Sequence, residues 1–429
     1  MSASEDSCLP SQVDVWGRSM AEDEVIRILG AGLSGLAAAT ILAKAGKNVE
    51  VHEIREDSGA RFDGDFQGLE NWTSSKDFFD EMVDWGLDPN SFKSTDFYDM
   101  SLIHPDDVVS TPKSDRIAFR IVERGTDEHC IDQGFKRMAL DAGASIHYKS
   151  EIKSEDCTII AAGPKETSAI AFGEVFHTSF PNHVAFQLND KLAPGAYSYL
   201  IVIDGVGLIC TCLWRKQKRS NRYLNETIAW YENAYPELDR KPIKRVGGKG
   251  DFSIPSTYYS NGKYYVGEAG GLQDFMWGFG MRYAVTSGVM AANSILNGID
   301  YDATIRKNLL PLIKLSATNR MLLDRVGDRG FKRLANLWMR RQRKNGGDGL
   351  LFMERIYRPD IIRRFLWPFT NRILLKKTTF PDGRKGRRMP FRKALKRDSW
   401  EMSNRAKEIA DEWKEIRSSG GKVSFSESD

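Results

Sequence analysis

The sequence predicts a mixed α/β protein (α+β overall) with a parallel sheet, a separate antiparallel sheet and a helical C-terminal segment. Residues 25–53 show the order strand, glycine-rich turn, helix and strand. Residues 174–255 alternate apolar and polar side chains, which is typical of antiparallel strands with one buried face. Residues 300–417 carry helical runs and no strand pattern. A chain of 429 residues is long enough for two or three such units.

The first of these segments has a recognisable glycine pattern. The apolar run Val25–Leu29 leads into Gly30-Ala31-Gly32-Leu33-Ser34-Gly35, and a small-residue helix then ends at Gly46. A second strand ends on the acid Glu53. Strand, turn, helix, strand and acid in this order form the fingerprint of a Rossmann-like dinucleotide-binding domain.

Each residue of the turn has a physical role. Gly30 permits the tight turn, Gly32 lets a pyrophosphate approach the backbone, and Gly35 lets the helix pack close to the strand. Leu33 and Ser34 belong to the turn, and the helix expected from Leu36 to Ala45 offers free N–H groups and the positive end of its dipole to phosphates. The turn alone does not choose between FAD and NAD(P).

Three further segments are expected near the same ligand. Glu53 can accept hydrogen bonds from ribose hydroxyls and disfavours a 2′-phosphate, while Arg61 is either a pyrophosphate or flavin contact or a solvated arginine. Ala162 and Gly163 end a buried strand and would let the backbone pass close to a dinucleotide. A late segment holds a carboxylate, a glycine-rich loop and the start of a small-residue helix: Glu268, Gly278, Phe279, Gly280 and Met281.

The predicted domain organisation follows from these patterns. A helix is expected over 71–85, and short strands over 96–124. The nucleotide-binding domain is expected over 24–173 with 256–299, with part of the second domain inserted near 66–120. The antiparallel substrate domain is expected over 174–255, and a basic helical region follows over 300–417. Residues 1–23 and 418–429 are expected to be a disordered lead and a disordered tail.

Composition excludes several classes of protein. Five scattered cysteines show no metal-site spacing and no disulfide framework, so we expect no metal and a reducing cytoplasm. Cys210 and Cys212 are expected to be small core residues of a strand. Residues 1–23 lack the charge and apolar pattern of a signal peptide, and no run of 18 apolar residues occurs, so no membrane span is expected.

The C-terminal region carries an uneven charge. Between 331 and 397, roughly twenty Lys and Arg residues face four acids, with Trp, Phe and Leu interleaved. This pattern suits either a helix lying on an anionic membrane surface or a helical cap with a solvated basic face. No nucleic-acid motif accompanies the charge, so nucleic acid is not expected as a partner.

The motifs together resemble a known family. The segments Gly30–Glu53, Thr158–Pro164 and Val266–Ala292 occur in the order found in FAD-dependent oxidoreductases of the para-hydroxybenzoate hydroxylase fold. Within that group the chain resembles the geranylgeranyl reductase family through Ala193-Pro194-Gly195-Ala196-Tyr197-Ser198-Tyr199 and the late Gly-Glu-Ala-Gly-Gly…Gly-Phe-Gly run. The resemblance covers about residues 24–298 and implies a Rossmann-like FAD-binding domain beside an antiparallel substrate-binding domain.

The resemblance also implies roles for individual residues. Gly30, Gly32, Gly35 and Glu53 would hold the ADP half of FAD, and Glu268 would bind its ribityl or phosphate region. The backbone of Gly278–Met281 would lie near the flavin ring. Substrate-pocket walls are expected from four aromatic residues: Tyr197, Tyr199, Trp277 and Phe279. The loop 59–64 lacks the cysteine that archaeal lipid reductases carry, and no catalytic residue is assigned.

Three functions remain open on this basis. The first is an FAD-dependent reductase that transfers hydride from flavin N5 to a carbon–carbon double bond of an apolar, prenyl or lipid-like substrate. Its electron donor would be NAD(P)H or a ferredoxin-like protein. The second is a monooxygenase acting through a flavin hydroperoxide. The third is a non-catalytic flavoprotein docked on a membrane, so the expected location is cytoplasmic with a peripheral membrane contact as one alternative.

Overall fold

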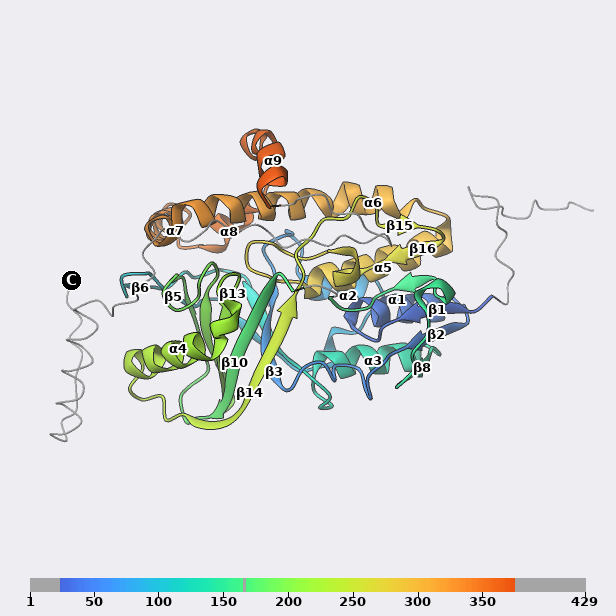
Figure 1. Cartoon of the computed structure of the whole chain (residues 1–429), viewed down its shortest axis with the longest axis horizontal. Coiled ribbons are helices and arrows are strands. Elements are labelled where there is room, and N and C mark those ends of the chain that lie inside the picture. The colour runs from blue at the N-terminus through green and yellow to red at the C-terminus, as the bar shows by residue number, and fades with distance from the viewer. Residues whose placement is uncertain (1–23, 165–166, 375–429) are drawn as a thin grey trace, which may run out of the picture.

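The computed structural model describes residues 24–164 and 167–374, and the predictions for 1–23, 375–417 and 418–429 lie outside these residues. The molecule has two lobes beneath a layer of helices (Figure 1). One lobe is built on a mostly parallel sheet and the other on a mostly antiparallel sheet. The predicted mixed α/β class is confirmed.

The first lobe is a six-stranded sheet with the order β15-β16-β9-β1-β2-β8. Its strands are β1 Ile26–Leu29, β2 Val49–His52, β8 Ser145–His147, β9 Ile159–Ile160, β15 Tyr259–Ser260 and β16 Lys263–Tyr265. Only β15 runs antiparallel to its neighbour. The helices of this lobe are α1 Leu33–Lys44, α3 Ile131–Asp141 and α5 Met281–Asn297. Helix α3 is a crossover connection of this sheet, because β8 follows it and pairs in parallel with β2.

Close backbone packing explains the glycines of this lobe. Gly30 has a φ of 108°, and a Cβ there would lie 2.7 Å from the carbonyl oxygen of Ala161. A Cβ on Gly35 would overlap the carbonyl oxygen of Gly30, and one on Gly288 of α5 would overlap that of Ser34. Strand β1, helix α1 and helix α5 therefore pack at distances that no larger residue allows.

The second lobe is a seven-stranded sheet with the order β14-β10-β13-β12-β11-β5-β6. Its strands are β5 Ser101–Ile103, β6 Val109–Ser110, β10 Ala169–His177, β11 His183–Gln187, β12 Ser198–Ile203, β13 Val206–Leu213 and β14 Lys241–Gly250. Helix α4, Ser220–Ala234, packs against β10 and β13. Asp204 and Gly205 both have positive φ and join β12 to β13 in a hairpin. Strand β10 begins at Ala169, before the expected boundary at 174, and β5 and β6 come from the segment expected to be inserted near 66–120.

A small third sheet joins the lobes. Its strands are β3 Asp65–Glu70, β4 Ser94–Phe97 and β7 Phe119–Arg124, in the order β3-β7-β4. The helix expected over 71–85 was predicted too long: α2 spans only Phe78–Asp84, followed by the short turn η1 Pro89–Ser91. Asp77 caps α2 by accepting from Phe79 N, and Asn71 accepts from Phe78 N instead of joining the helix.

Four helices form the upper layer: α6 Tyr301–Asn308, α7 Leu310–Lys344, α8 Leu350–Ile356 and α9 Ile361–Leu374. Helix α7 runs above both lobes, and α9 stands out from it (Figure 1). At Gly327 the backbone of α7 leaves helical geometry, with φ 54° and ψ −152°. Within the described ranges, no helix has the length and apolar character needed to cross a membrane.

Candidate functional site

A single large cavity of about 740 Å³ connects the glycine turn of the first lobe to the inner face of the antiparallel sheet. Gly30, Gly32 and Glu53 line one end. Aromatic and aliphatic side chains line the other end. The polar and apolar ends belong to the same space, so one ligand can contact both.

The glycine turn leaves room for a ligand at Gly32. A Cβ placed on Gly32 would meet no atom within 4 Å, although Gly30 and Gly35 beside it are tightly enclosed. Glu53 lies against the turn: its Oε2 accepts from Ala31 N and its Oε1 from Arg55 N, both at 3.0 Å. The carboxylate is therefore held where a ribose would lie in a Rossmann-like site.

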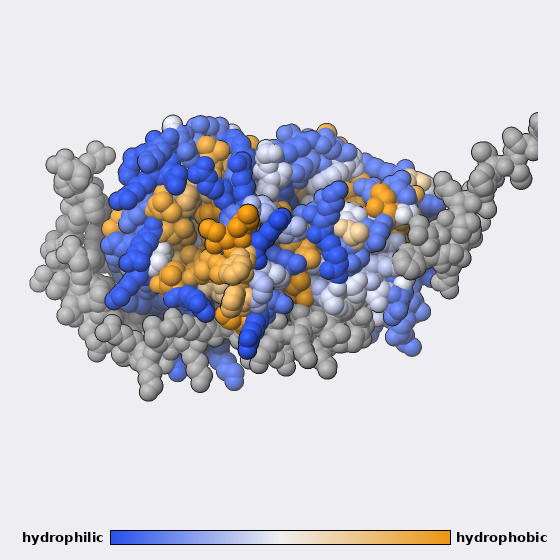
Figure 2. Space-filling view, turned by 90° about the horizontal axis from the view of Figure 1, so that it is seen from above, coloured by the Kyte–Doolittle hydropathy of each residue, from blue (hydrophilic) through white to orange (hydrophobic). Residues whose placement is uncertain are grey.

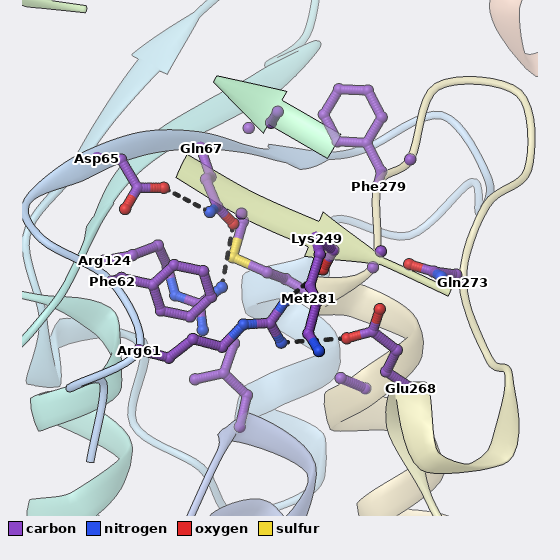
Figure 3. Close-up of a pocket in the computed structure, with 18 of the residues that line it drawn as sticks. Arg61, Phe62, Asp65, Gln67, Arg124, Lys249, Glu268, Gln273, Phe279 and Met281 are labelled. Atoms are coloured by element: carbon purple, nitrogen blue, oxygen red, sulfur yellow. Dashed lines mark hydrogen bonds and ion pairs between the residues drawn. The ribbon is translucent and has the colours of Figure 1, made fainter. Parts of the chain in front are cut away.

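Arg61 and Glu268 meet on the wall of the cavity (Figure 3). Arg61 Nη1 lies 3.2 Å from Glu268 Oε2, and Arg61 also donates to the carbonyl of Lys249. Asp251 N donates to Glu268 Oε1 at 2.9 Å. Burial raises the pKa of Glu268, and the positive charge of Arg61 opposes this rise. The pair joins the loop after β2 to the turn η4, Gly267–Gly270.

A second polar group was not foreseen from the sequence. Arg124 forms a buried bidentate ion pair with Asp132 at 2.8 Å for both bonds. Gln67 bridges Arg124 at 3.0 Å to Asp65 at 2.7 Å, as the dashed lines in Figure 3 show. The Phe62 ring lies 3.9 Å from the Arg124 guanidinium. The pairing of β3 with β7 brings these polar side chains together, and no local motif in the sequence predicts their contact.

Asp274 fixes the loop that precedes α5. It accepts from Trp277 N at 2.6 Å and from the Tyr357 hydroxyl at 2.8 Å, and its own N–H donates to Phe279 O. Burial raises the pKa of Asp274 to about 6. Because the loop is held this way, Gly278, Gly280 and Met281 line the cavity at the N-terminus of α5.

The far end of the cavity is an aromatic chamber. Tyr197 donates its hydroxyl to the carbonyl of Trp277, and the Phe186 ring lies 4.3 Å from the Tyr197 ring. Phe279 packs edge-on against Trp72 at 5.1 Å between ring centres. Burial raises the pKa of Tyr197 and of Tyr199 well above the usual tyrosine range, so both are neutral at neutral pH.

The upper helices complete this chamber, which sequence reasoning did not anticipate. Residues of α7 and α8 line it: Leu334, Ala335, Trp338, Phe352, Met353 and Ile356. The sequence marked these residues only as apolar bulk within a basic region. Their convergence on the cavity depends on long-range packing, which spacing along one helix does not reveal.

Nearly all predicted site residues line this cavity. They are Gly30, Gly32, Leu33, Ser34, Glu53, Arg61, Ala162, Gly163, Tyr197, Tyr199, Glu268, Trp277, Gly278, Phe279, Gly280 and Met281. Gly35 does not line it but lies on the side of α1 that faces Ile28 of β1, which is the packing role expected from the pattern. Cys210 and Cys212 are buried as expected, and they line the cavity as well.

Histidines form a cluster near the ribose end. The rings of His52 and His147 stack at 4.9 Å because β2 and β8 pair in parallel. With Glu50 they form one of two groups in the described chain that have the composition of a metal site, the other being Glu123, His129 and Cys130. Glu50 already pairs with Arg27 at 3.0 Å. The expectation of no metal stays a prediction.

Comparisons with known proteins identify the fold. The family of NAD(P)-binding Rossmann-like domains matches residues 28–68. A geranylgeranyl bacteriochlorophyll reductase-like protein of Thermoplasma acidophilum is similar in structure, with a TM-score of 0.58, 18% identity and coverage of 73% of this chain and 91% of that one. No curated protein sequence matches the chain significantly.

Two halogenating enzymes share the same architecture. The flavin-dependent brominase Bmp2 has a TM-score of 0.54 and 14% identity over 81% of this chain and 98% of its own. The FAD-dependent myxobacterial chondrochloren halogenase has a TM-score of 0.51 and 13% identity over 69% and 80%. The chain therefore has the fold of FAD-dependent oxidoreductases, and the prediction of FAD as cofactor is confirmed at the level of the fold.

Proposed function

We propose that the protein is an FAD-dependent reductase of carbon–carbon double bonds in an apolar, prenyl or lipid-like substrate. The observation that carries this proposal is the single cavity that joins the glycine turn to the aromatic chamber. Between the inner sheet face and helices α7 and α8, the lining side chains are mostly aromatic and aliphatic and include the thiols of Cys210 and Cys212, while Lys249 of β14 is the charged lining residue of this sheet. Such a chamber favours an apolar substrate beside the flavin ring.

The residues of the cavity fit FAD along its length. Gly32 leaves room for a pyrophosphate at the N-terminus of α1, and Glu53 would accept hydrogen bonds from the ribose. Arg61 and Glu268 flank the middle of the cavity, where a ribityl chain and phosphates would run. The backbone of Gly278–Met281, at the N-terminus of α5, would stabilise negative charge on the ring.

Trp277 offers a polar contact to a substrate. Trp277 lines the cavity and is buried, and its indole N–H has no hydrogen-bond partner in the part of the chain that the structure describes. A buried donor without an acceptor is unfavourable, so an acceptor on a bound ligand would stabilise it. We propose that the substrate presents a carbonyl or hydroxyl oxygen to Trp277. Tyr197 is less suited, because its hydroxyl already donates to a backbone carbonyl.

The chemistry is divided between cofactor and protein. Reduced FAD, when bound, supplies the hydride that adds to one carbon of the double bond, and a proton completes the other carbon. The chain positions both partners and excludes water through its aromatic walls. NAD(P)H or a ferredoxin-like protein would reduce the cofactor. The halogenating neighbours share only the fold, so oxygen-dependent hydroxylation is the alternative that experiment must decide.

The first experiment tests cofactor binding. Purified protein titrated with FAD should show saturable binding and the visible spectrum of bound oxidised flavin. Gly32→Val should weaken this binding at least tenfold because the added side chain fills the space for the pyrophosphate. Trp277→Phe, at the other end of the cavity, should bind FAD as the wild type does. A wild-type protein that binds no FAD contradicts the proposal.

The second experiment separates reduction from oxygenation. The FAD-loaded protein is reduced with NADH, NADPH or dithionite without oxygen and then mixed with prenyl-chain alkenes. Reoxidation of the flavin by the alkene under anaerobic conditions supports a reductase. Product formation that requires oxygen and consumes it in proportion supports the monooxygenase and contradicts the reductase.

A further inference from the structure

Helix α9 carries a row of large apolar side chains that nothing in the described chain covers. Ile361, Ile362, Phe365 and Phe369 are exposed by 83%, 71%, 74% and 55%. Residues 361, 365 and 369 are spaced four apart and residue 362 adjoins them, so the four share one helix face. We call these four residues the α9 face. Figure 2, seen from the side on which α9 stands out, shows apolar surface bordered by hydrophilic surface.

The opposite side of α9 is firmly attached to the molecule. Arg363 donates to Asn319 Oδ1 at 3.1 Å, to the Arg358 carbonyl at 2.8 Å and to the Ile356 carbonyl. Trp367 contacts the Lys314 ammonium at 5.2 Å. Because these contacts fix the rotation of α9, its apolar face is directed away from the protein.

Several arginines lie on α9 and beside it, and the acids Glu354 and Asp360 pair with Arg358 and Arg363. Arg355, Arg358, Arg364 and Arg372 are all exposed on α8, α9 and the turn between them. The segment 375–397 follows α9 directly in the sequence and contains ten Lys or Arg residues and one acid. Apolar side chains bordered by arginine suit the boundary between headgroups and acyl chains of an anionic bilayer.

We propose that α9 docks the protein on an anionic lipid bilayer, with the α9 face inserted among the headgroups. A second copy of the chain fits less well, because a symmetric contact would place the same positive charges opposite one another. Docking on the bilayer does not depend on the proposed function, but its benefit for catalysis rests on that function. Arg363 ties α9 to Ile356, whose side chain lines the chamber, so a docked protein would hold its chamber near a lipid-borne substrate.

The test measures binding of the full chain to vesicles by co-sedimentation. Vesicles of phosphatidylcholine alone are compared with vesicles of equal parts phosphatidylcholine and phosphatidylserine. We expect binding to the anionic vesicles, weak binding to the neutral ones, and a large loss when salt rises from about 0.1 M to about 1 M. Binding to neither kind of vesicle at low salt overturns the proposal.

Variants separate the α9 face from general surface charge. Phe365→Glu with Phe369→Glu should weaken binding at least about tenfold, because two apolar anchors are lost and two negative charges gained. Val83→Glu with Ile299→Glu alters two apolar residues that are 61% and 50% exposed on other elements, and adds the same charge. This control should retain most of the binding. Equal loss in both variants overturns the role of α9.

Further readouts keep this test independent of catalysis. Each variant is checked for FAD binding and thermal unfolding, which should match the wild type because all the altered side chains are exposed. Failure of FAD binding in the wild type would contradict the proposed function and leave vesicle binding to be judged alone. A dimer that the α9 variant abolishes, without vesicle binding, would assign the face to a second copy and overturn the proposal.

Discussion

Arg61 and Glu268, which are 207 residues apart in the sequence, form an ion pair of 3.2 Å on the cavity wall. The pair closes the junction between the loop after β2 and the turn after β16. Both side chains are largely shielded from solvent, at 27% and 19% exposure. A partly buried pair of this kind leaves an unfavourable charge when only one member is removed.

A double-mutant cycle measures this pair. Arg61→Met should lower the free energy of unfolding by about 1–2 kcal/mol, because the positive charge of Arg61 no longer offsets the unfavourable burial of the Glu268 carboxylate. Glu268→Gln should have a similar effect, and the double variant should lose less than the sum of the two. Urea unfolding of the four proteins gives the coupling energy. Strict additivity would show that the two side chains do not interact in solution.

The glycine turn predicts opposite outcomes at two neighbouring positions. Gly35→Ala should destabilise the fold by more than about 2 kcal/mol, since its Cβ would overlap the carbonyl of Gly30. Gly32→Val should change stability by less than about 1 kcal/mol, because its Cβ meets open space, and should affect FAD binding instead. Thermal unfolding without FAD compares the two. Similar stabilities for the two variants would contradict the packing described here.

Asp274 predicts a pH dependence of stability. Its folded pKa of about 6 lies above its unfolded value of 3.8, so between these values the folded state binds a proton that the unfolded state releases. Stability from this group therefore rises as the pH falls through 6. Between about pH 7 and pH 5, the wild type should gain about 1 kcal/mol relative to Asp274→Asn. Urea unfolding at both pH values measures the difference in stability between the wild type and the variant. The same difference at both pH values would show that the pKa of Asp274 is not raised.

Gly68 and Phe279 predict a compensating pair of substitutions. A Cβ on Gly68 would lie 2.6 Å from the ring of Phe279, so Gly68→Ala should destabilise by about 1–3 kcal/mol. Adding Phe279→Leu should recover most of this loss, because the shorter side chain frees the space. Phe279→Leu alone serves as the control and should cost about 1 kcal/mol. If Phe279→Leu does not recover stability, the loss in Gly68→Ala does not come from contact with the Phe279 ring.

The nucleotide-binding end could be predicted from the sequence because its signals are local. Strand, glycine turn, helix and Glu53 lie within 25–53, and each residue type has one physical reason to be there. The start of α5 at Met281 was predicted for the same reason. Prediction failed at α2, where the side chains of Asn71 and Asp77 make the helix begin later, at Phe78, than its apolar spacing suggested.

The rest of the site depends on contacts between distant segments. Gln67 meets Arg124 only through the register of β3 and β7, and His52 meets His147 only through the register of β2 and β8. Trp338 reaches the chamber because α7 crosses the molecule. A single sequence contains no signal for such pairings, since each residue by itself is compatible with a solvated or ordinary core position.

Helix α7 has a mechanical consequence for the whole molecule. Its Ser316 accepts a hydrogen bond from Phe275 in the first lobe, and its Asp324 pairs with Arg215 of the second lobe at 2.8 Å. Helix α7, which runs above both lobes (Figure 1), therefore links them. Separation of the two lobes would break the contacts of Ser316 and Asp324 with them. We therefore expect substrate and product to enter and leave the cavity through local movements of loops and side chains.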